Sequence, residues 1–184
     1  TFIAVMTLAL GIGANTTVYT FLNAVLFEPI PFKDTERTVF IWSANAHQHE
    51  RRGLVSVPDF VDWRNGNQVF EEMGAFGTDT LTLTGSGEPE RIQATLVTAS
   101  FFPMLHTAAQ LGRTFLPSEE SASGDRSAVL SHGFWQRRFG GDPNVLGRTV
   151  TLDSIAYTIV GVMPQGVWFP RADSSLWLPL RADS

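Results

Sequence analysis

The first 27 residues carry no charged side chain, and Glu28 is the first charged residue. At about 1.5 Å per residue, a helix over Phe2–Phe27 is longer than a hydrocarbon core of roughly 30 Å requires. Aliphatic residues and glycine dominate Phe2–Ala14, whereas Asn15–Asn23 mixes in several Asn and Thr side chains. The pattern predicts the end of a transmembrane helix, continued by a stalk that packs on a partner helix.

Pro29 and Pro31 end this helix, because proline lacks the backbone N–H and disfavours helical geometry in the residue before it. We expect Phe2–Leu26 to be one continuous helix that projects from a globular body. Two other interpretations stay open. A signal peptide usually has a shorter apolar core preceded by a basic segment, which this chain lacks. The stretch is also compatible with a buried helix of a soluble protein.

Runs of β-branched, aromatic and alternating apolar residues follow, and they predict strands. The predicted strands are Thr38–Ser43, Thr78–Thr84, Glu90–Val97 and Ser127–Leu130. Residues 85–89, Gly-Ser-Gly-Glu-Pro, join the second and third as a hairpin loop. Two stretches near the C-terminus, Trp168–Pro170 and Leu176–Pro179, are expected to be short edge pieces, because proline limits ladder hydrogen bonding.

Polar and capping residues predict the loops and short helices between these strands. Asn45–Gly53 and Pro117–Asp125 are expected to be polar loops. Ser56 begins a capping-box pattern with Pro in the first turn, which predicts a helix that stops at the Asn65-Gly66-Asn67 turn. A further short helix is expected over Ala99–Leu105. His106 follows it where a left-handed residue is expected, and histidine tolerates that conformation better than most non-glycine residues.

The rest of the chain is organised around residues 130–164, which begin with a capped helix. Ser131 is placed as its N-cap, and Leu130 and Trp135 are spaced as a hydrophobic staple. Trp135 and Phe139 lie four residues apart, on one helical face. Arg137 and Arg138 fall in the last turn, where the helix dipole favours cations. Gly140 or Gly141 can supply the left-handed residue that ends the helix.

A single turn and two strands complete this stretch. Asp142 and Pro143 are spaced as the cap and first position of the turn, which Gly147 closes. Arg148–Leu152 and Tyr157–Met163 are the strands, with a tight turn at Asp153-Ser154. The second strand is apolar on both faces from Ile159 to Met163, so it is expected to be central and covered.

Charge and composition exclude several classes of function. The chain has 184 residues and a net charge of −5, which gives no electrostatic case for binding nucleic acid or an anionic membrane surface. It has no cysteine, so disulfides, cysteine–zinc sites and thiol nucleophiles are excluded. No glycine-rich loop is followed by Lys and Ser or Thr, so the chain has no Walker-type ATP site.

Three side-chain groups have residue types found in chemical sites. His47 and His49 could both ligate a metal from one side of a strand, but a third ligand is not evident. Asp59 and Asp62 could act as a carboxylate pair, yet both lie near a helix N-terminus where the dipole favours them. Ser131, His132 and Asp142 cannot form a catalytic triad, because adjacent helical residues do not face each other. We therefore expect no catalytic, cofactor-binding or metal-binding residue.

The sequence resembles the MacB-like periplasmic core domain of ABC transporter permeases in the FtsX/MacB family. The family pattern is matched in order by Leu130, Ser131, Trp135, Phe139, Gly140, Asp142, Pro143, Gly147, Val160, Gly161, Val162, Met163 and Pro164. Further similarity lies in Gly11–Thr16, Asn23–Phe32, Ser56–Arg64 and Leu111–Phe115. Glu28, His106 and the Asp153-Ser154 turn depart from the family pattern. Nine positions form its structural motif: Ser131, Trp135, Phe139, Gly140, Asp142, Pro143, Gly147, Gly161 and Pro164.

The resemblance implies an α+β fold, in which an N-terminal transmembrane or stalk helix precedes a mixed α/β periplasmic domain of short helices and β-hairpins. Residues 1–27 would be the end of the first transmembrane helix and the stalk. Residues 28–184 would be the periplasmic core domain, incomplete at its C-terminal end. The chain starts with Thr1 and ends without an obvious stop to the fold, so we expect a fragment truncated at both ends.

The resemblance also implies a function without catalysis. The extracytoplasmic domain would transmit ATP-driven motion for efflux or for transport of a lipoprotein, lipopeptide or toxic compound. Its partners would be a cytoplasmic ATP-binding subunit, a second permease copy or half, the lipid bilayer and a further periplasmic protein. ATP would bind the separate subunit, and the location would be the bacterial inner membrane. The alternative is a periplasmic binding or adaptor module without transport activity.

Overall fold

The computed structural model describes residues 2, 6, 12, 13, 16, 37–45, 50–53, 55–85, 88–167 and 169–181. The chain divides into two compact units, Thr1–Ile30 and Pro31–Ser184. In the first unit, the five described residues are helical, and Phe2, Met6 and Ile12 are exposed. The predicted helix Phe2–Leu26 otherwise lies outside the described residues. Within the described ranges, no helix has the length and apolar character needed to cross a membrane.

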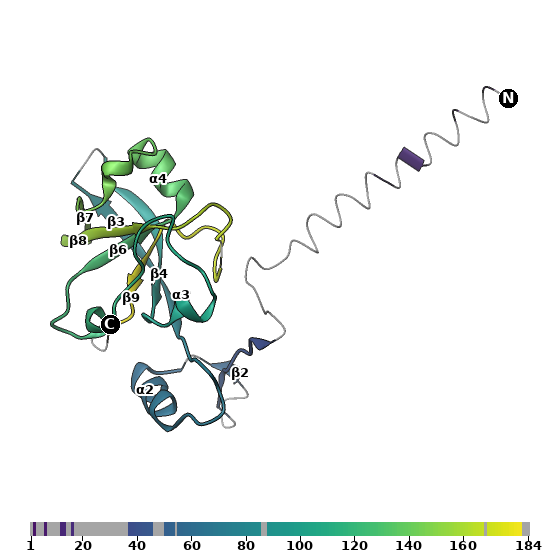
Figure 1. Cartoon of the computed structure of the whole chain (residues 1–184), viewed down its shortest axis with the longest axis vertical. Helices are drawn as coiled ribbons and strands as arrows, with labels where there is room; N and C mark the ends of the chain where they lie inside the picture. The colour runs from purple at the N-terminus through teal and green to yellow at the C-terminus, as the bar shows by residue number, and fades with distance from the viewer. Residues whose placement is uncertain are drawn as a thin grey trace. The chain divides into compact units, whose positions relative to one another are not determined.

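The second unit is built on a seven-stranded sheet. Its strands are β3 (Phe76–Thr84), β4 (Glu90–Val97), β5 (Leu111–Gly112), β6 (Ser127–Leu130), β7 (Thr149–Leu152), β8 (Ile155–Val162) and β9 (Leu176–Pro179). They lie in the order β5-β8-β6-β9-β4-β3-β7, and β7 also pairs with β8. That extra pairing closes the sheet into a ring, with β5 added outside it (Figure 1).

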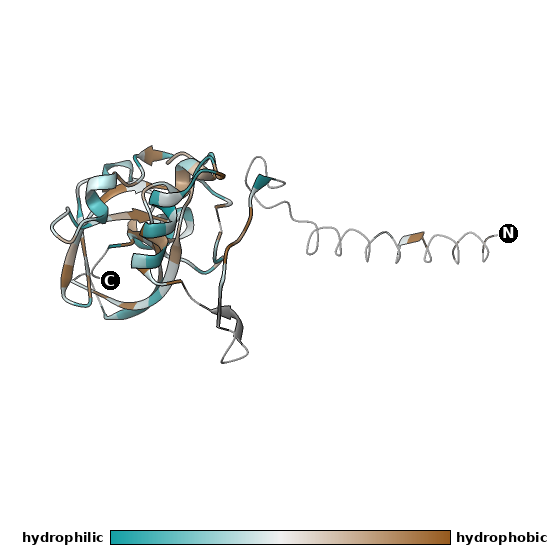
Figure 2. Cartoon of the chain, turned by 90° about the horizontal axis from the view of Figure 1, so that it is seen from below, coloured by the Kyte–Doolittle hydropathy of each residue, from teal (hydrophilic) through white to brown (hydrophobic). Residues whose placement is uncertain are grey.

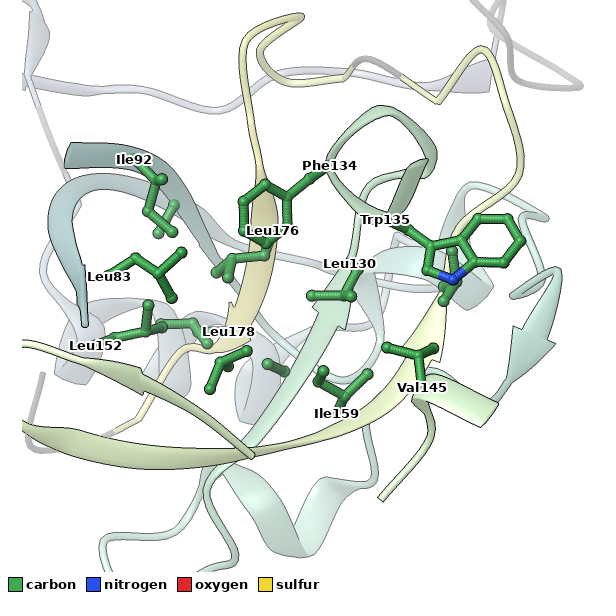
Figure 3. Close-up of a cluster of buried hydrophobic side chains, with 14 residues drawn as sticks. Leu83, Ile92, Leu130, Phe134, Trp135, Val145, Leu152, Ile159, Leu176 and Leu178 are labelled. Atoms are coloured by element: carbon green, nitrogen blue, oxygen red, sulfur yellow. The ribbon is translucent and has the colours of Figure 1, made fainter. Parts of the chain in front are cut away.

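The inside of the ring is filled by one hydrophobic cluster. Leu83, Ile92, Leu130 and Ile159 belong to it, and each is at most 3% exposed. Helix α4 (His132–Phe139) adds Phe134 and Trp135 to the same cluster. Figure 3 shows the Phe134 ring beside Leu176 of β9, so the helix covers an end of the barrel.

A second hydrophobic cluster lies on the outer side of the strands. It follows from the alternation of side chains along each strand, because successive residues point to opposite faces. In β9, Leu176 and Leu178 join the inner cluster, whereas Trp177 joins the outer one. Helix α3 (Phe101–Met104) supplies Phe101 and Phe102 to the outer cluster. The barrel wall is therefore covered on both faces at this point.

Helix α2 (Val57–Gly66) and a small two-stranded sheet precede the barrel in the chain. The Ser56 hydroxyl accepts a hydrogen bond from the Asp59 N–H at 3.2 Å, and Asn67 is the C-cap, as predicted. The two strands are β1 (Ser43–Asn45) and β2 (Glu50–Gly53), paired antiparallel. Two 3₁₀ helices complete the description, η2 (Pro117–Glu120) and η3 (Pro143–Val145).

Two predictions at the start of the second unit were wrong. Of the predicted strand Thr38–Ser43, only Ser43 lies in a strand, because Val39–Trp42 has no ladder partner among the described residues. All four of these apolar side chains are exposed. In the hydropathy colouring of Figure 2 this stretch of the chain is brown, for hydrophobic. The predicted loop Asn45–Gly53 instead contributes β2 and the end of β1. Strand propensity alone misplaced the pairing by a few residues, since neighbouring strands decide it.

The predicted edge piece Leu176–Pro179 was also wrong. This segment is β9, which pairs parallel with β4 and antiparallel with β6, and all four residues are buried. Pro179 is the last strand residue, where its missing N–H costs little, and the ladder continues through the Leu180 N–H to Val97. Phe169 and Pro170 belong to no strand, and Trp168 lies outside the described residues.

Other predictions were confirmed closely. The hairpin of β3 and β4 and the strand β6 have the expected positions. Strand β8 is central from Ile159 onward, between β6 on one side and β5 on the other. The mixed fold of short helices and strands therefore agrees with the sequence.

Candidate functional site

Six of the nine motif residues lie in α4 and the turn after it, in a segment that we call the α4 cap, residues 131–145. Ser131 has extended φ and ψ of −71° and 150°, and its hydroxyl accepts a hydrogen bond from the Phe134 N–H at 3.2 Å. Gly140 ends the helix with φ of 61°, in the left-handed region, and Gly141 follows with φ of 72°. Both predicted ends of the helix are thus confirmed, and glycine is favoured at each left-handed position.

Trp135 joins the α4 cap to the barrel. Its side chain belongs to the inner cluster and the residue is only 6% exposed, as predicted. Its indole Nε1–H donates a hydrogen bond to the backbone oxygen of Asp142 at 2.9 Å. The ring also contacts His132, with centroids 5.5 Å apart. The indole therefore contacts both ends of the α4 cap. Its ring packs on His132 near the start, and its N–H donates to Asp142 near the end.

Asp142 organises the turn after α4. Its carboxylate accepts a hydrogen bond from the Asn144 N–H at 2.9 Å and pairs with Arg148. The backbone hydrogen bond from Asn144, with help from Arg148, lowers the pKa of Asp142 below its ordinary value. Pro143 occupies the first position of η3, as predicted. The carboxylate therefore acts as a cap that stays ionised at neutral pH.

Three motif residues shape the path into β8. Gly147 has φ of 80°, and its N–H donates to the Ile159 oxygen at 2.8 Å. Gly161 lies where β5 crosses closely, since a Cβ there would come 2.1 Å from the Arg113 oxygen. Pro164 follows β8 and is half-buried. Glycine at position 161 is thus required by close backbone approach.

Phe139 lies beside a small surface hollow. Its ring contacts Phe134 at 6.1 Å between centroids and packs against the inner cluster. The hollow has a volume of about 120 Å³ and is lined by Phe139, Arg138 and residues of β3 and β7. Ligand pockets usually measure roughly 300–1,000 Å³. This hollow is therefore too small to enclose a drug-sized ligand.

The structure contains a buried carboxylate that the sequence did not indicate. Glu119 of η2 has a side chain only 3% exposed and forms two hydrogen bonds with Arg113, at 2.9 and 3.0 Å. It also accepts hydrogen bonds from the Leu116 N–H at 2.7 Å and from the Ser127 hydroxyl. Burial alone raises the pKa of Glu119, but these hydrogen bonds and the Arg113 charge outweigh it and lower the pKa.

Glu119 and its hydrogen-bond partners attach the predicted polar loop Pro117–Asp125 to the barrel. Glu120 next to it accepts from the Ala99 N–H at 2.6 Å and pairs with Arg64 of α2 at 3.2 Å. Arg181 donates to the Gly124 oxygen at 2.9 Å. The sequence has no periodic pattern that would indicate these contacts, because the partner residues lie on several different elements. Their bonds are all satisfied within the protein, so the arrangement is structural.

The three groups with residue types found in chemical sites either have structural partners or lie outside the described residues. His132 Nδ1 lies 3.3 Å from Gln110 Oε1, and the Ser131 hydroxyl caps α4. The Asp59 carboxylate accepts from the Ser56 hydroxyl at 2.6 Å. His47 and His49 lie outside the described residues. Elsewhere, within the described residues, no three His, Cys, Asp or Glu residues are grouped so that they could hold a metal ion.

Comparisons with known proteins agree with the resemblance. Residues 1–183 match the model of a protein family described as the MacB-like periplasmic core domain. The extracellular domain of the noncanonic ABC-type transporter YknZ from Gram-positive bacteria is similar, with a TM-score of 0.56 and 20% identity. That match covers 68% of this chain and 63% of the YknZ chain.

The periplasmic region of MacB from Actinobacillus actinomycetemcomitans has a TM-score of 0.57 and 12% identity. This match covers 76% of the present chain, which spans about 63% of the MacB chain. At these identities the two structures indicate a shared fold. The comparison with curated proteins found no match.

Proposed function

Because the chain belongs to the family of MacB-like periplasmic core domains, we propose that it is the extracytoplasmic part of an ABC transporter permease. In this role it passes ATP-driven motion to a substrate or partner outside the cell membrane, and it has no catalytic centre of its own. The match to the family over residues 1–183 is the observation that carries the proposal.

The proposed setting is the bacterial inner membrane, with the barrel on the periplasmic side. Residues 1–27 would anchor the domain in the lipid bilayer as the end of a transmembrane helix. A cytoplasmic subunit would bind the ATP, and a second permease copy or half would complete the pore. The transported class would be an efflux compound, lipoprotein or lipopeptide.

Contacts on the outer side of the barrel support a mechanical role. Phe40, near the start of the second unit, contacts Phe169 with ring centroids 5.6 Å apart. Phe169 in turn stacks on Phe101 of α3, at 6.0 Å and an interplanar angle of 10°. These rings link residues 37–42 to the wall of a barrel whose strands are hydrogen-bonded in a closed ring. A body of this kind moves as a unit, because shearing its strands would break several hydrogen bonds at once.

The test uses the full permease with its ATPase subunit, expressed in cells that lack the native copy. Trp135→Ala, which removes the link between the α4 cap and the barrel, is expected to abolish transport. Untargeted mass spectrometry of the cell envelope and medium measures the transported compounds. ATP binding to the ATPase subunit should persist, because the substitution lies in a different subunit and compartment.

Val69→Ala is the matched control, since Val69 is 86% exposed and lies outside both hydrophobic clusters. This variant should transport normally. Transport that survives Trp135→Ala with the domain unfolded would contradict the proposal. Saturable nucleotide binding to the purified chain, measured by calorimetry, would also overturn it.

A further inference from the structure

Strand β3 is paired along nearly its whole length on one side and only at its end on the other. On one side, residues 76–83 pair with β4. On the other side, only Leu83 and Thr84 pair with β7. Asp153, in the turn between β7 and β8, extends this contact by one residue, because it exchanges two hydrogen bonds with Thr82. Before Thr82, no described strand lies against this edge of β3.

The hydrogen bonds of β4 determine which backbone groups of β3 face the open side. Gln93 and Val97 of β4 accept hydrogen bonds from the β9 side. Ala94 and Leu96, at alternate positions, therefore direct their backbone groups toward β3. Ala94 and Leu96 are in register with Asp79 and Gly77. The odd-numbered residues of β3 therefore bond to β4, since directions alternate along a strand. Phe76, Thr78 and Thr80 direct their N–H and C=O groups outward.

This open edge is exposed and carries one charge. Phe76, Thr78 and Asp79 are exposed, and Thr80 is half-buried. The Asp79 carboxylate accepts a hydrogen bond from the Thr80 N–H at 2.7 Å, which occupies one of the outward donors locally. A charged residue on an unpaired edge is a common device against unspecific strand pairing. Asp79 therefore disfavours a strand that places no opposite charge beside it.

We propose that the open edge of β3, residues 76–80, accepts an extended segment of a partner protein that carries Lys or Arg opposite Asp79. Outward N–H and C=O groups recognise the backbone of another strand, which is how strand addition provides affinity. An antiparallel segment would continue the direction in which β7 pairs with β3. This interaction does not depend on the proposed transport role.

The charge of the edge favours a basic partner over a second copy of the chain. Asp79 would form a non-hydrogen-bonded pair with the residue opposite it, and side chains in such pairs approach most closely. Opposite charges at these positions stabilise a sheet, and like charges destabilise it. Pairing two copies would bring their Asp79 carboxylates together, and each chain already has a net charge of −5.

The test titrates a capped peptide, acetyl-Thr-Val-Thr-Arg-Thr-Val-Thr-amide, into the ¹⁵N-labelled full chain in detergent. The amide signals of Phe76, Thr78 and Thr80 are expected to shift and saturate. A second peptide carries N-methyl groups on the two Thr residues that flank Arg, whose N–H groups would face β3. It should bind at least about tenfold more weakly. A third peptide, methylated on both Val residues, is the control and should bind like the first.

Three variants test the edge from the side of the protein. Thr78→Pro removes an outward N–H and should weaken binding at least about tenfold, whereas Thr78→Val should bind like the wild type. Asp79→Lys should reverse the preference, so that the peptide with Glu in place of Arg binds better. If Thr78→Pro fails to fold, the N-methylated peptides on the wild-type chain decide the question.

Three results would contradict the proposal. Absence of shifts in β3 at millimolar peptide, or equal binding of all three peptides, would overturn the proposal. Concentration-dependent shifts of the same amides without any peptide would show self-association through β3, and would replace the basic partner with a second copy.

Discussion

At the scale of single residues, the indole of Trp135 has the strongest predicted effect on stability. It fills part of the inner cluster and donates the hydrogen bond to Asp142. Trp135→Ala is expected to lower the free energy of unfolding by about 3–5 kcal/mol, as large aromatic truncations do. Trp135→Phe should cost less, because most of the packing remains while the hydrogen bond is lost. Urea denaturation measures both, and a loss well under about 1 kcal/mol for Ala would contradict the assigned role.

Glu119 predicts a dependence of stability on pH. Its pKa is lowered in the folded protein, so its contribution is present above the ordinary carboxylate pKa of about 4.3 and is lost as the pH falls through the folded value. At neutral pH, Glu119→Gln should lower the free energy of unfolding by about 1.5–3 kcal/mol, typical of hydrogen bonds to charged groups.

The difference in the free energy of unfolding between wild type and Glu119→Gln should narrow as the pH falls from about 5 toward 3. Thermal melts across this range provide the measurement. Glu88→Gln is the control, because Glu88 is exposed. A gap that stays constant, or widens in acid, would mean that the Glu119 carboxylate is not stabilised by its partners.

At the scale of elements, the turn between β7 and β8 carries removable strain. Asp153 and Ser154 have φ of 46° and 70°, in the left-handed region that side chains disfavour. Ser154→Gly should therefore stabilise the protein by about 1 kcal/mol. Asp153→Gly relieves similar strain but removes the carboxylate that accepts from the Thr82 N–H. Melting temperatures compare the two, and equal gains from both would show that the Asp153 hydrogen bond contributes nothing.

The close approach of β5 and β8 predicts that alanine has opposite effects on stability at two glycine positions. A Cβ at position 161 would collide with the Arg113 backbone, whereas one at position 133 in α4 would meet nothing within 4 Å. Gly161→Ala should thus destabilise the barrel by about 1–3 kcal/mol or more through overpacking. Gly133→Ala should stabilise it by up to about 1 kcal/mol through helix propensity. Chemical denaturation tests both signs, and a neutral Gly161→Ala would contradict the close approach.

Elements with local signals were predictable from the sequence. Ser131 and Gly140 mark the ends of α4 by capping chemistry, which depends on neighbouring residues alone. The strand β9 was not predictable in the same way, because proline suggested an edge and only β4 and β6 on either side make it central. Glu119 was missed for a similar reason, since its partners come together only when η2 packs on the barrel.

At the scale of the whole molecule, the ring of strands was not predictable. The sequence indicated strands and two hairpins, β3–β4 and β7–β8. Closure of the ring, however, depends on β7 pairing with both β3 and β8. The sequence of a strand does not indicate which distant strand it pairs with, because the apolar pattern of a short strand is similar for different partners. The family, in contrast, was recognisable from the ordered motif around α4, and the family match over residues 1–183 confirmed it.

The proposed function requires that this domain moves with the ATP state of a permease. The chain has no cysteine, so one introduced thiol can be labelled selectively. Ser123→Cys is suitable, because Ser123 is exposed in the turn after η2. A nitroxide at this position, in the full permease with its ATPase subunit in nanodiscs, reports the distance between two permease copies by pulsed electron paramagnetic resonance.

We predict that the distance distribution differs between the nucleotide-free and ATP-trapped states. Phe169→Ala, which removes the ring between Phe40 and Phe101, should diminish this difference while ATP hydrolysis continues. Identical distance distributions with and without ATP, in a permease that hydrolyses ATP and transports, would contradict the mechanical role.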